Sequence, residues 1–143
     1  MAWTHILALV ALVLGTAALA VPQILRLRPP APIRGLVRWA EGRELRTRGD
    51  GRTAPLEIIG THAGRLFTVG YQLGSPDVML VAIDCNAAGD AALSGGFRLS
   101  DAALVSRWTD PTPEHLAGLD TLLDAMAQAA ADLEAQGPPA DDD

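Results

Sequence analysis

The stretch RLFTVGYQLGSPDVMLVAID, residues 65–84, decides the fold of this 143-residue chain. Two runs rich in β-branched and aromatic residues, 66–73 and 78–84, flank the turn-forming segment 74–77, which is typical of antiparallel strands. The second run is apolar on both of its faces, which predicts a central position in a sheet. In the first run large apolar residues alternate with small or polar ones, so four are expected to face the core: Phe67, Val69, Tyr71 and Leu73.

Weaker patterns on both sides extend this sheet. Residues 56–60 form another strand-like run, separated from the first by the turn signal 61–64. After a loop at 85–96, residues 97–99 predict one more short strand. Residues 100–108 fit a brief helix capped by Ser100 and fit a strand almost as well, so both alternatives stay open.

The last element is predicted to be an amphipathic helix. Thr112 is suited to the N-cap, Pro113 to the first helical position, and the Gly-Pro pair at 137–138 to the stop. One apolar stripe would pack on the sheet: Leu116, Leu119, Leu122, Leu123, Met126, Ala130 and Leu133. The predicted fold class is therefore α+β, with one N-terminal transmembrane helix followed by a small antiparallel sheet and a C-terminal helix packed on it.

The N-terminal segment has the length of a membrane span. Residues 6–25 carry no charge, and twenty helical residues cover about the 30 Å of hydrocarbon in a bilayer. The Ala-Leu-Ala triplet at 18–20 resembles a signal-peptide cut site, but residues 1–5 lack the basic residues of a secretion signal. Arginines follow the apolar segment, which favours retaining that side in the cytoplasm. We expect a single-pass anchor with a cytoplasmic domain; the alternative is an exported periplasmic or secreted protein.

Small residues recur along one side of this expected span. Ala8, Ala11, Gly15 and Ala18 follow helical spacing and would let a second helix approach closely. The expected partner there is another membrane protein or a second copy of this chain.

The segment after the span is rich in arginine and proline. Prolines at 29, 30 and 32 should end a continuous helix near Leu27. Residues 33–45 then fit a short amphipathic helix in the lipid headgroup region, although a flexible stalk or a first strand fits the same residues. Lipid headgroup contacts are expected from five side chains: Arg26, Arg28, Arg34, Arg38 and Trp39.

The tripeptide Arg48-Gly49-Asp50 matches the one found in integrin ligands. Its neighbours, Gly51 and Arg52, make a glycine-rich turn with an aspartate, and Asp-Gly is a common turn dipeptide. We therefore interpret the tripeptide as turn chemistry.

Charge divides the chain into regions. Eight of the eleven arginines lie between residues 26 and 52, whereas fourteen of the seventeen acidic residues follow residue 52. The expected organisation is an anchor at 1–27, a linker at 28–52, a domain at 53–136 and a disordered acidic tail at 137–143. The acidic domain would repel phosphate, so nucleic-acid binding is not expected.

The chain offers little catalytic chemistry. It contains no lysine for a phosphate loop, and its three histidines lie in separate segments, so neither a cofactor nor a metal site is expected. The one enzymatic alternative is a thiol enzyme in which Cys85 is activated by His62 or His115, but Asp84 beside it would raise the thiol pKa. We expect a non-enzymatic accessory, assembly or scaffold component of a membrane complex.

Overall fold

The computed structural model describes residues 28–136. The expected span at 6–25, its small-residue face, Arg26 and the tail at 137–143 lie outside the described residues. The chain divides into two units, Met1–Ala31 and Pro32–Asp143, and the second contains the sheet. Among the helices of residues 28–136, none has both the length and the apolar character needed to cross a membrane.

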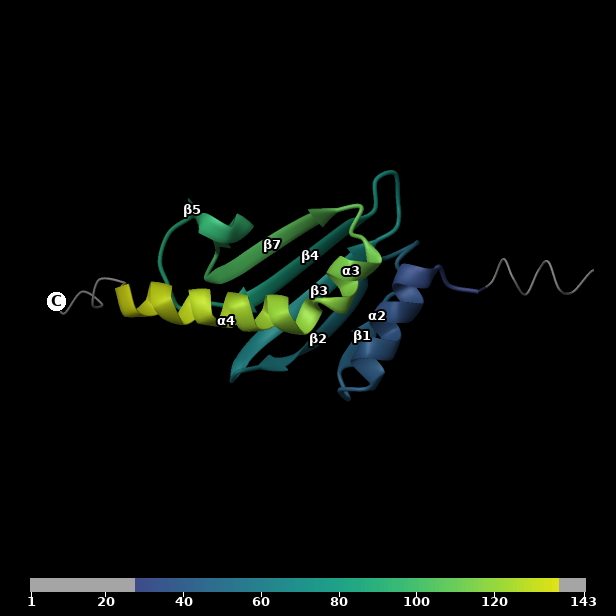
Figure 1. Ribbon diagram of the computed structural model, residues 1–143, viewed down its shortest axis with the longest axis horizontal. Coiled ribbons are helices and arrows are strands. Elements are labelled where there is room, and N and C mark those ends of the chain that lie inside the picture. The colour runs from purple at the N-terminus through teal and green to yellow at the C-terminus, as the bar shows by residue number, and fades with distance from the viewer. Residues whose placement is uncertain (1–27, 137–143) are drawn as a thin grey trace, which may run out of the picture. The chain divides into compact units, whose positions relative to one another are not determined.

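The second unit is built on one antiparallel sheet of seven strands, in the order β1-β2-β3-β4-β7-β6-β5 (Figure 1). The predicted meander is confirmed by β2 (Leu56–His62), β3 (Arg65–Gln72) and β4 (Val78–Asp84). As its two-sided apolar pattern predicted, β4 occupies the middle of the sheet. The remaining strands are β1 (Arg46–Arg48), β5 (Ala91–Ala92), β6 (Phe97–Ser100) and β7 (Ala103–Thr109), with a single 3-10 turn, η1 (Ser94–Gly96), before β6.

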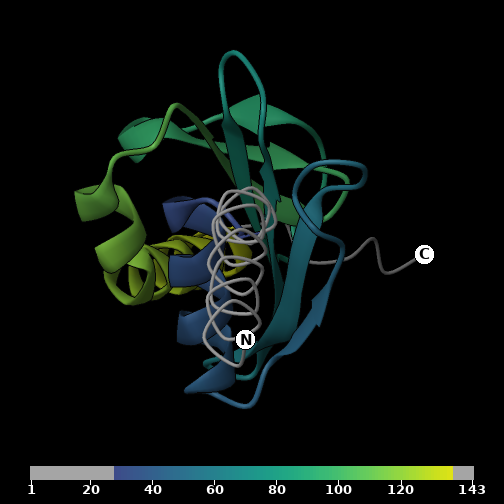
Figure 2. The ribbon, with the colours of Figure 1, turned by 90° about the vertical axis from the view of Figure 1, so that its right-hand side faces the viewer.

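Three helices, α2 (Ala31–Glu41), α3 (Pro113–Ala117) and α4 (Leu119–Gln136), lie on one side of the sheet (Figure 2). We call this the closed face; in β4 it carries Met79, Val81 and Ile83, which are all buried. The opposite side, which carries Val78, Leu80 and Ala82, is the open face. The expected C-terminal helix therefore packs on the sheet as predicted.

The domain begins earlier than expected. The segment 28–52, interpreted from the sequence as a linker, contributes α2 and β1 to the fold. The apolar stripe of α2, formed by Ile33, Leu36 and Ala40, is buried in the protein core and so is not available to insert into a membrane surface. Pro32 lies in the first turn of α2, where the missing amide costs no helical hydrogen bond.

In the C-terminal half, the structure decides between helix and strand for residues 100–108, and it divides the predicted C-terminal helix in two. Residues 103–109 form a strand, because β7 completes the backbone pairing of β4 on its free side. The predicted cap at Thr112 is confirmed: its hydroxyl accepts from the His115 amide, and the His115 ring accepts from the Thr112 amide. The single predicted helix is instead two, because the Gly118 amide closes α3 by donating to the Glu114 and His115 carbonyls.

Candidate functional site

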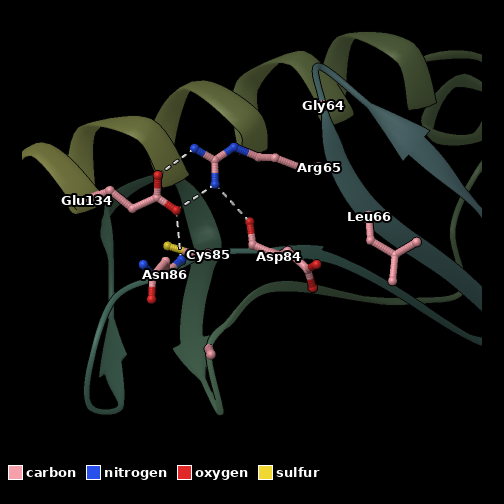
Figure 3. Close-up of a pocket in the computed structure, with 8 residues that line it drawn as sticks. Gly64, Arg65, Leu66, Asp84, Cys85, Asn86 and Glu134 are labelled. Carbon is pink, nitrogen blue, oxygen red and sulfur yellow. Dashed lines mark hydrogen bonds and ion pairs between the residues drawn. The ribbon is translucent and has the colours of Figure 1, made fainter.

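A shallow hollow of about 440 Å³ lies where β4 ends (Figure 3). Its floor is an ion pair between Arg65 at the start of β3 and Glu134 near the end of α4, with both nitrogen–oxygen distances at 2.7 Å. The same guanidinium donates to the Asp84 carbonyl, and the Asn86 amide donates to Glu134 at 2.7 Å. Arg65, followed by the Asn86 amide, lowers the pKa of Glu134 to about 2. Every group in this cluster is therefore already paired, and the cluster fastens α4 to the sheet.

Cys85 lies beside this cluster but is only 1% exposed. Its sulfur is 3.7 Å from the Ala130 carbonyl of α4, and burial, with Glu134 second, raises the pKa of the thiol. A catalytic cysteine needs an accessible, stabilised thiolate. These contacts give no support to the thiol-enzyme alternative.

The two histidines considered as bases are engaged elsewhere. His62 lies near the same end of the sheet as Cys85, and its Nε2 is 2.7 Å from a carboxylate oxygen of Asp124 in α4. His115 packs against Trp108, with ring centroids 4.5 Å apart. Trp108 pairs with Met79 near the start of β4, so about six residues of strand, roughly 20 Å, separate His115 from Cys85.

A second cluster joins α2 to α4. The Trp39 indole donates to Asp120 at 3.3 Å, and Arg43 pairs with the same carboxylate while lying 4.7 Å from the centre of the Trp39 ring. Trp39 also meets Phe67 edge to face at 6.2 Å. The structure thus uses Trp39, expected at the lipid headgroups, to hold α2 against the rest of the domain.

The expected headgroup arginines are placed as follows. Arg28 and Arg38 are exposed, Arg34 is half-buried, and Arg26 lies outside the described residues. Among residues 28–136, no carboxylate pairs with any of them. Their contact with lipid stays a prediction, now without the inserted apolar stripe that was expected to accompany it.

The Arg48-Gly49-Asp50 tripeptide belongs to a loop organised by its aspartate. Asp50 accepts hydrogen bonds from the amides of residues 52, 53 and 54 and from the Thr53 hydroxyl. These bonds, the Arg52 amide first, lower the pKa of Asp50 to about 2. The interpretation of the tripeptide as turn chemistry is confirmed.

None of the described helices covers the open face, since all three lie on the other side of the sheet (Figure 2). Leu66 and Leu80 project from it and are 48% and 42% exposed. Half-buried Ile59, Val78, Ala82 and Val105 lie on the same face. Its central strands therefore present mostly aliphatic side chains, interrupted by Thr68 and Gly70. Sequence reasoning found the two-sided pattern of β4 but not this surface, because the surface exists only once the strand register is known.

Strand register places arginines at both margins of the open face. One row of paired residues begins at Arg46 in β1 and ends at Arg98 in β6, and crosses Ile59, Thr68, Ala82 and Val105. The next row begins at Arg48 in β1 and ends at Arg107 in β7, and crosses Glu57, Gly70 and Leu80. Directly paired residues project from the same face, so an aliphatic centre is bordered by cations on two sides.

These arginines differ in their partners. Arg48 pairs with Glu57 at 2.6 Å. Within the part of the chain that the structure describes, no carboxylate lies within ion-pair distance of Arg46, Arg98 or Arg107. The open face therefore offers unpaired positive charge on both margins.

Neither a metal-ligand cluster nor a known relative assigns a role to the hollow or to the open face. Over residues 28–136, no three His, Cys, Asp or Glu side chains gather as metal ligands would. Comparison of the chain with protein-family models, with curated proteins and with solved structures gives no match.

Proposed function

We propose that this protein is a non-enzymatic accessory, assembly or scaffold component of a membrane complex, and that its domain binds a partner protein through the open face. The observation that carries the proposal is the aliphatic centre of that face, with Leu66 and Leu80 about half exposed while the other face is filled by the chain's own helices. Exposed apolar patches bordered by polar residues are typical of protein interaction sites.

The membrane part of the proposal rests on the sequence. The uncharged segment at 6–25 would anchor the chain once, and the arginines that follow it would keep the domain on the cytoplasmic side. The mass of the mature protein separates this topology from export, since cleavage after the Ala-Leu-Ala triplet would remove about twenty residues.

The binding part is tested by site-specific photocrosslinking in intact cells that make the full chain. A photoreactive residue in place of Leu80 should give a discrete crosslinked partner, and the same residue in place of Gln128, exposed on α4, should not. The double variant Leu66→Glu with Leu80→Glu should release the partner from membranes or lower its amount in the complex. A stable, normally assembled partner in that variant would contradict the proposal.

A further inference from the structure

We infer that the partner segment is an amphipathic helix whose apolar stripe carries carboxylates on both sides, lying along the strands of the open face. This inference rests on the proposed function and adds the chemistry of the partner. It is drawn from the spacing of the arginines, from the aliphatic centre between them and from the way α4 binds the opposite face.

The dimensions of the open face suit one helix. Adjacent strands are about 4.8 Å apart, so Arg48 and Arg107, four strands apart, lie roughly 19 Å from each other, and Arg46 and Arg98 roughly 24 Å. A helix with its side chains is about 10–12 Å wide. The arginine side chains on both margins can then reach carboxylates on the helix flanks. The eight residues of β3 cover about 26 Å, the length of a helix of about 18 residues.

On the closed face, this molecule already packs an amphipathic helix with flanking carboxylates. α4 buries Leu119, Leu123 and Met126 against the sheet. Carboxylates beside that stripe pair with cationic or histidine side chains of neighbouring elements: Asp120 with Arg43, Asp124 with His62 and Glu134 with Arg65. An apolar stripe flanked by carboxylates is therefore a combination that this domain already binds, and the open face presents three arginines, Arg46, Arg98 and Arg107, that no carboxylate of the described residues pairs with.

A second copy of the described domain does not supply this occupant. Stacking two open faces would oppose arginine margins, because each face carries four arginines against two carboxylates, Glu57 and Asp84. The acidic helix α4 of a second copy has its apolar stripe already buried. Charge complementarity therefore favours a different chain.

A lipid surface fits the open face less well than a helix. Proteins that insert into the membrane interface are enriched in Trp, Tyr and Phe side chains at that depth. In residues 28–136 all five such residues pack in or against the core of the closed face: Trp39, Phe67, Tyr71, Phe97 and Trp108. Between its arginines the open face presents aliphatic side chains together with Thr68 and Glu57, and none of these aromatic rings.

The inference is tested with two synthetic helices and the full chain in neutral detergent. Both peptides have 18 residues and the same leucine stripe; one carries glutamates on both flanks and the other lysines. A photoreactive residue in the stripe reports where each peptide binds. The acidic peptide should crosslink to β3 and β4 at or beside Leu66 and Leu80, should bind at least about tenfold more tightly than the basic one, and should weaken as salt is raised.

Charge reversal provides the sharper readout. Arg98→Glu combined with Arg107→Glu should weaken the acidic peptide by about tenfold or more and invert the preference between the peptides. The matched control, Arg34→Glu combined with Arg38→Glu, makes the same change of charge on α2 and should leave the preference unchanged. Circular dichroism of each variant confirms that the fold is kept.

Three results would overturn the inference. Equal affinity for the two peptides, or binding of neither, rejects the acidic helix. The face is assigned to lipid if the protein binds anionic vesicles, if Arg98→Glu combined with Arg107→Glu abolishes that binding, and if neither peptide is preferred. A dimer that Leu80→Glu dissociates assigns it to a second copy. The proposed function fails separately, since it requires the crosslink from position 80 in cells whatever the two peptides do.

Discussion

The two faces of the same sheet differ in burial, because helices cover the closed face and leave the open face exposed. In β4 every residue from 78 to 83 is apolar, yet Met79, Val81 and Ile83 are buried under helices while Leu80 remains 42% exposed. The difference does not come from the strand, because both of its faces have the composition of a core. It comes from the helices of the described domain, which are sufficient to cover one face. An apolar side of a strand shows only that this side can be buried. Which element buries it depends on the rest of the chain.

The largest expected difference between the faces is in core packing. Leu104→Ala removes a side chain with no exposure on the closed face and should lower the free energy of unfolding by about 2–5 kcal/mol. Leu80→Ala on the adjacent strand removes the same atoms from the open face and should cost less than about 1 kcal/mol. Urea unfolding followed by circular dichroism measures both. Equal losses would mean that the open face is covered within the isolated chain.

Two strand glycines offer a second comparison. A Cβ on Gly60 would lie 2.3 Å from the Leu45 side chain and 3.2 Å from the Phe67 ring, so Gly60→Ala should cost about 1–3 kcal/mol. On the open face, a Cβ on Gly70 would meet nothing closer than 3.9 Å, and Gly70→Ala should stay within about 0.5 kcal/mol of the parent. Thermal unfolding of both variants checks this. A loss at Gly70 as large as at Gly60 would contradict the assignment of the two faces.

A smaller, pH-dependent effect is expected from the ion pair that fastens α4. Because folding lowers the pKa of Glu134 from an ordinary 4.5 to about 2, the ionised carboxylate stabilises the fold above pH 4.5. That contribution is lost as the pH falls from 4.5 through about 2. The urea midpoint of the parent should therefore exceed that of Glu134→Gln at pH 6, and the gap should narrow at pH 3.

Asp132→Asn is the matched control for this titration, because Asp132 is exposed on the same helix and accepts a hydrogen bond only from Gln128 among the described residues. The difference in urea midpoint between the parent and Asp132→Asn should change less from pH 6 to pH 3 than the difference for Glu134→Gln. A gap for Glu134→Gln that stays constant from pH 6 to pH 3 would show that the ion pair with Arg65 does not stabilise the fold.

The smallest signal is expected from Cys85. Since the thiol is buried and its pKa is raised, iodoacetamide at pH 8 should label the folded chain more than about tenfold slower than a free thiol. Mass spectrometry counts the labelled fraction, and the same chain in urea should label at the free rate. Rapid labelling in the folded chain would revive the thiol-enzyme alternative.

Local pattern was enough to predict the strands between residues 56 and 84, because alternation and turn residues are encoded within each segment. It was not enough for residues 31–41, where arginines and prolines dominate the composition and only three residues, Ile33, Leu36 and Ala40, reach the core. The break at Gly118 was missed for a similar reason: the apolar stripe continues across it, and only the hydrogen bonds of its amide reveal the cap.

The candidate surfaces were less predictable than the strands. Arg65 and Glu134 are 69 positions apart, and no local rule joins them. The arginine margins of the open face depend on the pairing of β1 with β2 and of β6 with β7. A one-residue slip in either pairing would move the arginines of that strand to the other face. The sequence did predict that Asp50 forms a turn and that the pKa of the Cys85 thiol is raised, but it named Asp84 as the cause, where the structure shows burial first and then Glu134.

The sheet ends in very short strands, and this affects whether copies of the domain can join through their strand edges. β1 has three residues, two of them arginines, and β5 has two. Fibrils grow when an exposed strand edge recruits the backbone of another molecule, and short or charged edges resist that addition. The edges of this sheet are therefore poor templates for strand addition, and overproduced protein should not form amyloid through them.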